Sequence, residues 1–323
     1  MWRQIDSEFA ELINEFECFL EKQLPQKGGF LSEVSKKVIQ SGGKRLRPAF
    51  TILFSMMGEK DIFTDKEYKE RVFHTAAAIE ILHTATLIHD DIIDSADTRR
   101  GKPTVSCSYG TSMAVYTGDF LLVQTMLLLS KSGLDIEYLN TAAKGMEAVC
   151  LGEVDQYYQK YKITTVYSYL KRIIKKTALL FSVSATLGAR LSGLSDETIK
   201  NAAHFGLNFG TAFQLRDDML DLSSNKNDTG KPVLKDLKDG VITLPLILTA
   251  RDNKKIRSEI EQFFGSRDDA FADSILKDVI EAGGALKMQG ILEKYVIRAK
   301  KRLNMMPESK ARNILADIVN VIY

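Results

Sequence analysis

The sequence has 323 residues, 45% of them hydrophobic, which is enough for a large buried core in one or two domains. Lys and Arg total 44 and Asp and Glu total 42, and this near balance argues against a nucleic-acid binder with a generally basic surface. The three cysteines form no CxxC pair, the acidic N-terminus has no signal layout, and no apolar run approaches about 20 residues. We therefore expect a cytoplasmic protein without a transmembrane segment.

Long stretches without proline predict long helices. Only six prolines occur, and residues 104–231 contain none. Apolar residues recur there at helical spacing, for example in 120–128 and 173–184, whereas alternating runs with hairpin turns are lacking. Ser195 is expected to cap the helix that begins at Asp196. With no low-complexity linker and no internal repeat, we predict a single all-α domain over 1–323, a large bundle of ten or more helices whose sites are built from inward-pointing side chains.

A basic glycine turn is the first candidate site in chain order. Residues 41–48 read SGGKRLRP, so Lys44 and Arg47 follow two glycines at the start of a predicted helix. Glycines let the backbone approach an anion closely, and arginine binds phosphate in a planar fork. An exposed turn explains the same residues equally well when the motif is taken alone.

The next predicted helix ends in an acidic cluster formed by Asp90, Asp91 and Asp94. Residues i and i+4 share a helical face, and like charges at that spacing destabilise an isolated helix by about 0.2–0.5 kcal/mol per pair, so a cation is expected nearby. His83 lies seven residues earlier on the same face, and Arg99 and Arg100 follow. A packed core histidine is the common alternative for His83.

A second acidic cluster repeats this spacing further along the chain. Asp217, Asp218 and Asp221 lie in FQLRDDMLDL at 213–222. A solvated helix face explains one such motif, but two copies flanked by apolar sequence fit a lined cavity better. If the two helices face each other, six carboxylates converge, and they suit Mg²⁺, which one or two carboxylates usually hold together with substrate phosphates. The sequence therefore predicts a diphosphate substrate.

Two further lysines are candidate contacts for such a substrate. Lys176 and Thr177 interrupt an apolar helix, and Lys231 lies in a Gly-Lys-Pro loop after the second acidic motif. A mobile lid is a plausible function for that loop.

Seven motifs together resemble the trans-isoprenyl (polyprenyl) diphosphate synthase family. They are GGKRLRP at 42–48, HTATLIHDDIIDSADTRRGKPT at 83–104, YTGDFLL at 116–122, CLGEVDQ at 150–156, KKTALL at 175–180, FQLRDDMLD at 213–221 and GKP…DGVITLPLI at 230–247. The resemblance is greatest to medium- and long-chain synthases such as the heptaprenyl diphosphate synthase catalytic subunit. It implies an isoprenoid-synthase bundle around a deep central cavity, usually homodimeric, that condenses isopentenyl diphosphate with an allylic diphosphate.

The resemblance also assigns roles to individual residues. It implies three Mg²⁺ ions, held by a set of aspartates: Asp90, Asp94, Asp217 and Asp221. It implies that the allylic diphosphate contacts Arg99, Lys176, Gln214 and Lys231. It implies that isopentenyl diphosphate contacts Lys44, Arg47, His83 and Arg100. Thr177 would face the reacting carbon.

One position departs from the family pattern, and two positions bear on product length. Many members carry a lysine where this chain has Val241. Catalytic subunits of two-component heptaprenyl synthases resemble this chain in CLGE, in KKTALL and in having a residue other than lysine here, so a separate small subunit is an alternative to the homodimer. Short-chain members place a bulky aromatic four or five residues before the first motif, where this chain has Thr86 and Ala85. By this analogy we expect a product of roughly C25–C40. Alternatively, these small residues merely pack against another helix.

Other functions remain open at this point. His89 and Asp90 form an HD pair, which is typical of helical phosphohydrolases, but that function leaves the second acidic motif and the basic turn unexplained. A terpene cyclase shares the metal chemistry but needs no second diphosphate site. A short-chain geranylgeranyl or farnesyl synthase and a non-catalytic regulatory subunit are further alternatives.

Overall fold

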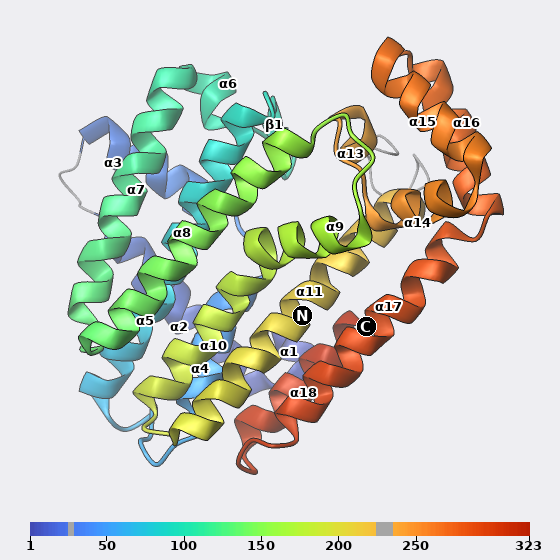
Figure 1. Cartoon of the computed structure of the whole chain (residues 1–323). Coiled ribbons are helices and arrows are strands. Elements are labelled where there is room, and N and C mark those ends of the chain that lie inside the picture. The colour runs from blue at the N-terminus through green and yellow to red at the C-terminus, as the bar shows by residue number, and fades with distance from the viewer. Residues whose placement is uncertain (25–28, 224–234) are drawn as a thin grey trace. The chain divides into compact units, whose positions relative to one another are not determined.

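The computed structural model describes residues 1–24, 29–223 and 235–323, and its regular structure there is almost entirely helical (Figure 1). The all-α prediction is confirmed. In chain order the elements are α1 (Trp2–Ile5), α2 (Ser7–Gln23), α3 (Gly29–Ile39), α4 (Leu46–Ser55), α5 (Lys66–Ile93), β1 (Thr98–Arg99), β2 (Lys102–Pro103), α6 (Val105–Tyr109), α7 (Thr111–Lys131), α8 (Ile136–Gln159), α9 (Val166–Ile173), the π-helical segment η1 (Ile174–Ala178), α10 (Leu179–Leu191), α11 (Asp196–Ser223), α13 (Lys235–Lys238), α14 (Leu244–Asp252), α15 (Lys254–Ser266), α16 (Asp269–Glu281), α17 (Gly284–Leu303) and α18 (Lys310–Ile322).

The helices form two compact units, which are described separately. Unit 1 comprises residues 1–146, 180–203 and 302–321, and unit 2 comprises residues 147–179, 204–301 and 322–323. The first acidic motif and the basic glycine turn belong to unit 1, whereas the second acidic motif and the Lys176-Thr177 segment belong to unit 2.

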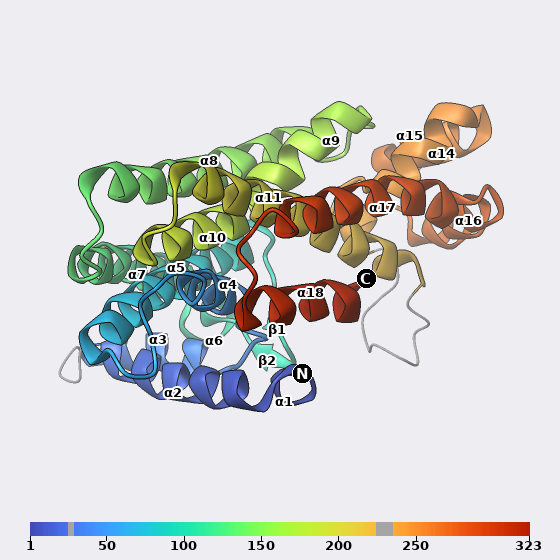
Figure 2. The same ribbon diagram turned by 90° about the horizontal axis from the view of Figure 1, so that it is seen from below.

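The helix α5 is the centre of unit 1, where it contacts α2, α3, α4, α6 and α7 (Figure 2). It begins where the Asp65 carboxylate accepts a hydrogen bond from the Tyr68 amide at 2.9 Å, a side-chain cap that satisfies a free helix-end donor. Ala76, Ala77 and Ala78 are fully buried on α5, and such small side chains allow a neighbouring helix to come close. The Thr125 hydroxyl of α7 donates to the Ala78 carbonyl at 3.5 Å. Packing along α5 therefore fixes the helix whose last turn carries the acidic motif.

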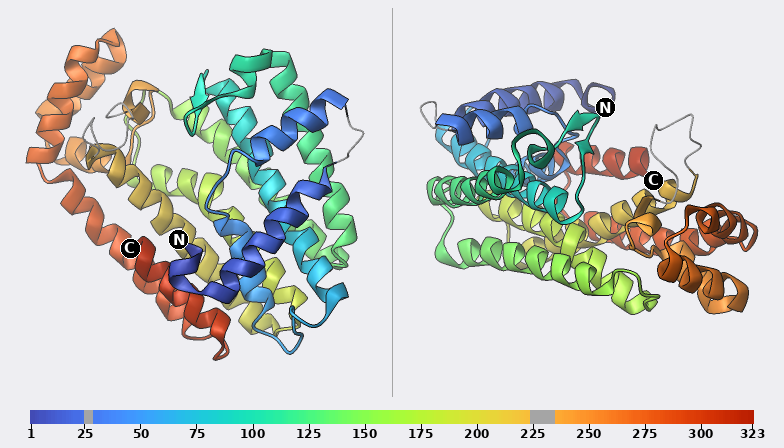
Figure 3. Two further views of the ribbon diagram at one scale, coloured as in Figure 1. Left: turned by 180° about the vertical axis from the view of Figure 1, so that it is seen from behind. Right: turned by 90° about the horizontal axis from the view of Figure 1, so that it is seen from above.

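A short antiparallel hairpin follows α5 and leads into α6 (Figure 3). It pairs Thr98 with Pro103 and Arg99 with Lys102. The Thr104 hydroxyl then caps α6 by accepting from the Cys107 amide at 3.1 Å. The hairpin thus sets Arg99 and Arg100 directly beside the last turn of α5.

Unit 2 has its own apolar core around α14. Leu215, Ile242, Ile247 and Ile275 are each at most 3% exposed and belong to one cluster with the inner faces of α15 and α16. These two helices pack against each other, and Figure 1 shows them as an adjacent pair. Tyr169 and Ile173 of α9, together with Leu215 and Leu222 of α11, belong to this core, so apolar burial helps to position both helices.

The helix α7 is long and apolar enough to cross a membrane by length and composition alone, and 44% of its most apolar window is buried in the structure. The remaining face exposes several large apolar side chains, namely Val115, Tyr116, Val123, Met126 and Leu127. The expected absence of a transmembrane segment therefore stays a prediction.

Candidate active site

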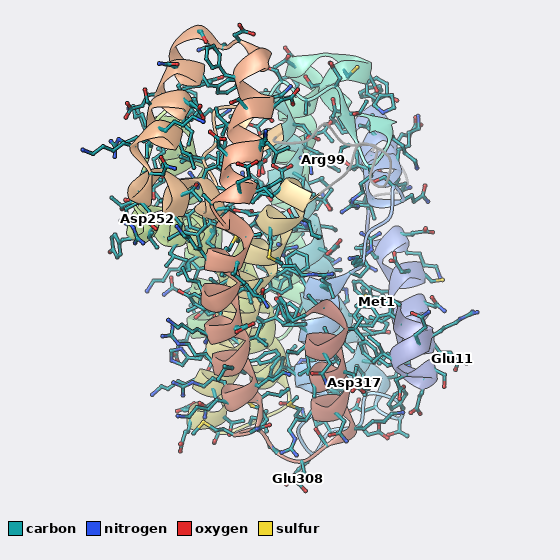
Figure 4. All side chains as sticks on the ribbon, turned by 90° about the vertical axis from the view of Figure 1, so that its right-hand side faces the viewer. Met1, Glu11, Arg99, Asp252, Glu308 and Asp317 are labelled. Atoms are coloured by element: carbon teal, nitrogen blue, oxygen red, sulfur yellow. The ribbon has the colours of Figure 1, made fainter. Side chains whose placement is uncertain are left out.

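The first acidic motif occupies the last turn of α5. The Asp94 amide donates to the Asp90 carbonyl at 2.8 Å, so the two side chains lie one helical turn apart on one face. Asp90 is 7% exposed and Asp94 is half-buried. Asp91 is also buried, and its Oδ1 accepts from Arg99 Nε and Nη2, each at 2.7 Å. Asp91 thus holds Arg99, which Figure 4 labels, in place.

A cavity of about 250 Å³ opens beside this pair in unit 1. Its polar lining includes the following residues: Arg45, Glu80, His83, Asp91, Arg99 and Arg100. Arg100 has a left-handed backbone with φ 52°, an uncommon conformation for a residue with a side chain. A Cβ at Gly43 would lie 3.1 Å from Arg100 Nη1, so the glycine of the basic turn makes room for this guanidinium. The structure therefore brings together three of the predicted diphosphate contacts, His83, Arg99 and Arg100.

Arg47 and His83 lie in the same electrostatic environment. The Arg47 guanidinium stacks over the Phe181 ring at 4.5 Å, and its buried Nε has no hydrogen-bond partner within the described ranges. Burial lowers the pKa of Arg47 to about 10, with a smaller effect from Arg100, so Arg47 stays charged at neutral pH. Burial, followed by the charges of Arg47 and Arg100, lowers the pKa of His83 well below its usual range. A neutral imidazole among arginines can donate one hydrogen bond to an anion without adding charge.

Not every predicted contact lines this cavity. Lys44 is exposed on the glycine turn. Ala85 is fully buried, Thr86 is half-buried with its hydroxyl bonded to the His83 carbonyl at 2.8 Å, and neither lines the cavity. Their proposed effect on product length stays a prediction.

In unit 2, a hydrogen-bonded chain joins the π-helical segment to the second acidic motif. The Thr177 hydroxyl donates to Gln214 Oε1 at 2.8 Å, and Gln214 Nε2 donates to Asp218 Oδ1 at 2.7 Å. The Tyr169 hydroxyl donates to Asp218 Oδ2 at 2.6 Å. Asp218 is 4% exposed and Tyr169 is fully buried. The middle aspartate of this motif therefore orients Gln214, which in turn orients Thr177.

The segment η1 widens the helix at Lys176 and Thr177. Such π-turns occur frequently at functional sites. Lys176 Nζ lies 2.7 Å from Glu153 Oε2 of α8. A Cβ at Gly152 would lie 3.0 Å from the backbone nitrogen of Lys176, so glycine allows α8 to approach η1. The π-helical segment thus lies where the sequence analysis placed an interruption of the apolar helix, at Lys176 and Thr177.

Three carboxylates surround Asp218 in unit 2. Asp217 is exposed and Asp221 is half-buried on α11, and Asp236 of α13 is half-buried as well. Burial raises the pKa of Asp236 to about 8, and the charges of Asp218, Asp221 and Asp217 contribute. Burial also raises the pKa of Asp218 to about 6. Our sequence analysis missed Asp236, which has no repeated motif around it. Lys231 lies outside the described residues.

The donors suit a hard cation. Asp90 and Asp94 offer only carboxylate oxygens, as do Asp217 and Asp221, and this is the chemistry that Mg²⁺ prefers. Within residues 1–24, 29–223 and 235–323 no three His, Cys, Asp or Glu side chains are placed to hold a metal by themselves. Mg²⁺ usually completes its shell with water and substrate phosphates, so the residues present fit this ion.

The geometry first defines a class of protein: an all-α protein with two carboxylate motifs and, in unit 1, a cavity lined by arginines. Residues 29–282 match the family model Polyprenyl synthetase. The chain is 33% identical to heptaprenyl diphosphate synthase component 2 of Bacillus subtilis over 311 residues, 96% of this chain and 87% of that protein. It is also 33% identical to geranylgeranyl diphosphate synthase of Sulfolobus acidocaldarius over 313 residues, 93% of this chain and 92% of that protein.

The fold comparison agrees. The structure of heptaprenyl diphosphate synthase from Staphylococcus aureus superposes with a TM-score of 0.91 at 32% identity, covering 97% of each chain. The chain therefore belongs to the polyprenyl synthetase family, whose members are trans-prenyltransferases. This result confirms the resemblance in the sequence and removes the helical phosphohydrolase as an alternative. In the structure His89 Nε2 lies 3.4 Å from Asp119 Oδ1.

Proposed function

We propose that the protein condenses isopentenyl diphosphate with an allylic diphosphate, head to tail and in the trans geometry, with Mg²⁺ as cofactor. The observation that carries the proposal is the cavity of unit 1, where Arg99, Arg100 and His83 meet next to the first acidic motif. A terpene cyclase has no use for a second cationic site of this kind. Ionisation of the allylic diphosphate accounts for the acidic motif, and binding of isopentenyl diphosphate as the acceptor accounts for the second cationic site.

In this proposal Asp90 and Asp94 of the first motif, and Asp217 and Asp221 of the second, would hold the Mg²⁺ ions, three in all, that accompany the allylic diphosphate. When bound, Mg²⁺ supplies Lewis-acid stabilisation of the departing pyrophosphate. Arg99 adds positive charge at the same group, and its ion pair with Asp91 keeps the guanidinium oriented before substrate binds. Lys176 and Gln214 supply further contacts, as does Lys231.

The arginine-rich site binds the second substrate. Lys44, Arg47, His83 and Arg100 contact the diphosphate of isopentenyl diphosphate. The allylic C–O bond breaks, and its electron pair leaves with pyrophosphate. The double bond of isopentenyl diphosphate forms the new C–C bond, and a proton leaves the adjacent carbon for the released pyrophosphate. Thr177, oriented by Gln214, stabilises the cation with its hydroxyl oxygen.

The test is a turnover assay on the purified chain with Mg²⁺, farnesyl diphosphate and labelled isopentenyl diphosphate. We expect elongated prenyl diphosphates, identified by mass spectrometry. Pyrophosphate release without consumption of isopentenyl diphosphate would support cyclisation instead. No reaction from the chain alone, but reaction after addition of a second polypeptide, would show a two-component enzyme.

We further propose a product of roughly C25–C40, because the residues just before the first motif are small. Ala85 is fully buried, so Ala85→Phe introduces a ring where no solvent lies. We expect this variant to shorten the longest product by at least one five-carbon unit, while Thr86→Ala leaves the distribution unchanged or longer. An unaltered product ladder from Ala85→Phe would show that this position does not limit chain growth.

The exposed face of α7 is proposed to bind a second copy of this chain. Tyr116, Val123 and Leu127 recur at helical spacing and are each at least 50% exposed, which is expensive for a lone protein in water. Two relatives are named component 2, which points to a small partner subunit as the alternative occupant. Sedimentation of the purified chain distinguishes the two. A dimer that Val123→Asp converts to monomers supports the homodimer, and a wild-type monomer supports the partner subunit.

The valine at position 241 has a testable consequence. Its amide donates to the Asp236 carbonyl at 2.7 Å, and its side chain brings no charge to the loop before α14. If many relatives use a lysine here to hold the allylic diphosphate, Val241→Lys lowers the KM for the allylic substrate. An unchanged KM would show that the chain has no need of this contact.

A further inference from the structure

A buried ion-pair network lies behind the proposed isopentenyl diphosphate site. Arg45 is 5% exposed and caps α4 with a left-handed backbone, φ 50°. Its Nη1 donates to Glu80 Oε1 at 2.7 Å, its Nε donates to Glu17 Oε1 at 2.7 Å, and its Nη2 donates to the Ile39 carbonyl at 2.7 Å. The two carboxylates are unlike, because the Glu80 side chain is 6% exposed and the Glu17 side chain 34%.

Glu80 differs from Glu17 in a second respect, its surroundings. It lines the cavity of unit 1 together with His83, Arg99 and Arg100. Its negative charge acts on Arg47 and Arg100 as well as on Arg45, whereas among these three arginines only Arg45 responds to Glu17. Buried charges interact more strongly than exposed ones because water screens them less. Glu80 therefore acts on all three members of an arginine cluster, Arg45, Arg47 and Arg100, and two of these, Arg47 and Arg100, are proposed to bind the substrate anion.

We propose that Glu80 is the built-in counter-ion of this arginine cluster: it keeps the cations together while the site is empty and limits how tightly the site holds a diphosphate. The inference rests on the proposed function in one respect. In head-to-tail condensation the allylic diphosphate is released, so the lengthened product carries the diphosphate of isopentenyl diphosphate. That group must leave the arginine cluster before another isopentenyl unit can bind there. A counter-ion that competes with it speeds this exchange.

The geometry separates the charge of Glu80 from its packing. In Glu80→Gln the amide oxygen can still accept from Arg45 Nη1, and Arg45 keeps its bonds to Glu17 and Ile39. The cluster thus loses a negative charge while Arg45 stays anchored. Glu17→Gln is the matched control, because it removes a carboxylate from the same arginine but leaves the cavity unchanged. Glu17 lies outside the proposed binding residues.

The first experiment measures binding of inorganic pyrophosphate by calorimetry in EDTA, where the carboxylate motifs have no metal with which to bind it. We expect Glu80→Gln to lower the Kd about three- to tenfold relative to wild type. Glu17→Gln should stay within about twofold of the wild-type Kd. Arg100→Gln should weaken binding in both backgrounds, which assigns the signal to this cluster.

The second experiment measures steady-state condensation. The KM for isopentenyl diphosphate should fall in Glu80→Gln by a similar factor, and the rate of successive additions should fall because the product leaves more slowly. A merely structural role predicts instead that both glutamine variants raise KM or lower stability alike. Equal effects of the two substitutions, or weaker pyrophosphate binding in Glu80→Gln, would overturn the proposal.

A folding failure of one variant does not remove the test. Glu80→Asp keeps the negative charge, but its side chain is one methylene shorter, so the charge lies further from the arginines. Its Kd for pyrophosphate should therefore lie between those of wild type and Glu80→Gln. A Kd for Glu80→Asp at or above the wild-type value would also contradict the proposal. Failure of the proposed function is recognised separately, because wild type would then bind pyrophosphate in EDTA without condensing isopentenyl diphosphate.

Discussion

The two acidic motifs share the same spacing of aspartates, DDxxD, but differ in their surroundings. In both, the middle aspartate is buried: Asp91 is 5% exposed and Asp218 is 4% exposed. Asp91 pairs with the guanidinium of Arg99, whereas Asp218 accepts hydrogen bonds from the neutral groups of Tyr169 and Gln214. A guanidinium bonds directly to the first carboxylate, whereas the second has neutral hydrogen-bond donors and only the more distant charge of Arg172, among the described residues, to offset its burial. The pKa of Asp218 is accordingly raised to about 6 by burial.

The comparison shows that the middle and outer aspartates of the repeated motif have different roles. In each copy the middle residue positions another side chain, Arg99 in unit 1 and Gln214 in unit 2. The outer residues are the ones that we propose as metal ligands. Substitutions at outer and middle positions should therefore differ in kind as well as in size.

The largest effect is expected from the outer aspartates. Asp90→Asn and Asp217→Asn each remove a charged ligand of the proposed Mg²⁺ ions, so kcat should fall by about 10²–10³-fold or more. Steady-state kinetics over a range of Mg²⁺ concentrations measures this, with the exposed residue Asp273, which lies in none of the motifs, changed to Asn as control. Activity within tenfold of wild type in either variant would show that its motif does not bind an essential metal.

A smaller effect is expected from the middle residue of the first motif. Asp91→Asn leaves Arg99 without its charged partner, so the guanidinium is no longer held in one orientation. The KM for the allylic diphosphate should rise about tenfold, with a lesser change in kcat. Asp97→Asn, an exposed change in the segment between α5 and the hairpin, should have no such effect. If kcat fell as far as in Asp90→Asn, Asp91 would have to be a metal ligand rather than a positioning residue.

The middle residue of the second motif should matter less again. In Asp218→Asn the amide cannot accept from both Tyr169 and Gln214, so one hydrogen bond must reverse or break. Thr177 is then oriented less well, and kcat should fall about three- to tenfold. Tyr169→Phe removes one donor and provides the comparison, since it leaves the Gln214–Asp218 bond intact. A KM change for isopentenyl diphosphate without a kcat change would contradict this role for Gln214.

The smallest effect concerns stability and pH. Asp236 has a pKa of about 8 in the folded protein against 3.8 in the unfolded chain, because burial and neighbouring carboxylates disfavour its charge. The unfolded chain therefore loses this proton first, and stability declines as pH rises from about 4 to about 8. In EDTA at pH 8, Asp236→Asn should melt about 3–6 °C above wild type. At pH 4 the two should melt together, and a constant difference at both pH values would exclude titration as its cause.

Much of the fold follows from local features of the sequence. The absence of proline from 104–231 and the helical spacing of apolar residues predicted long helices, and α7, α8 and α11 are long. Ser195 does cap α11, where its hydroxyl accepts from the Thr198 amide at 3.3 Å. The site residues came mostly from motifs whose charge is unusual on apolar helices. Asp236 and Glu80 were missed because a single acidic residue carries no pattern; only its neighbours in space reveal it.

The sequence by itself determined the helical class, the family and the residue types of the site, because periodicity, turn residues and motif spacing are local properties. Only the tertiary structure decided which carboxylates hold other side chains and which ones do not. Asp91 and Arg99 are eight positions apart, but Tyr169 and Asp218 are 49 apart, as Arg45 and Glu80 are 35 apart. Burial and pairing at such separations depend on how helices pack, and packing is a property of the whole chain.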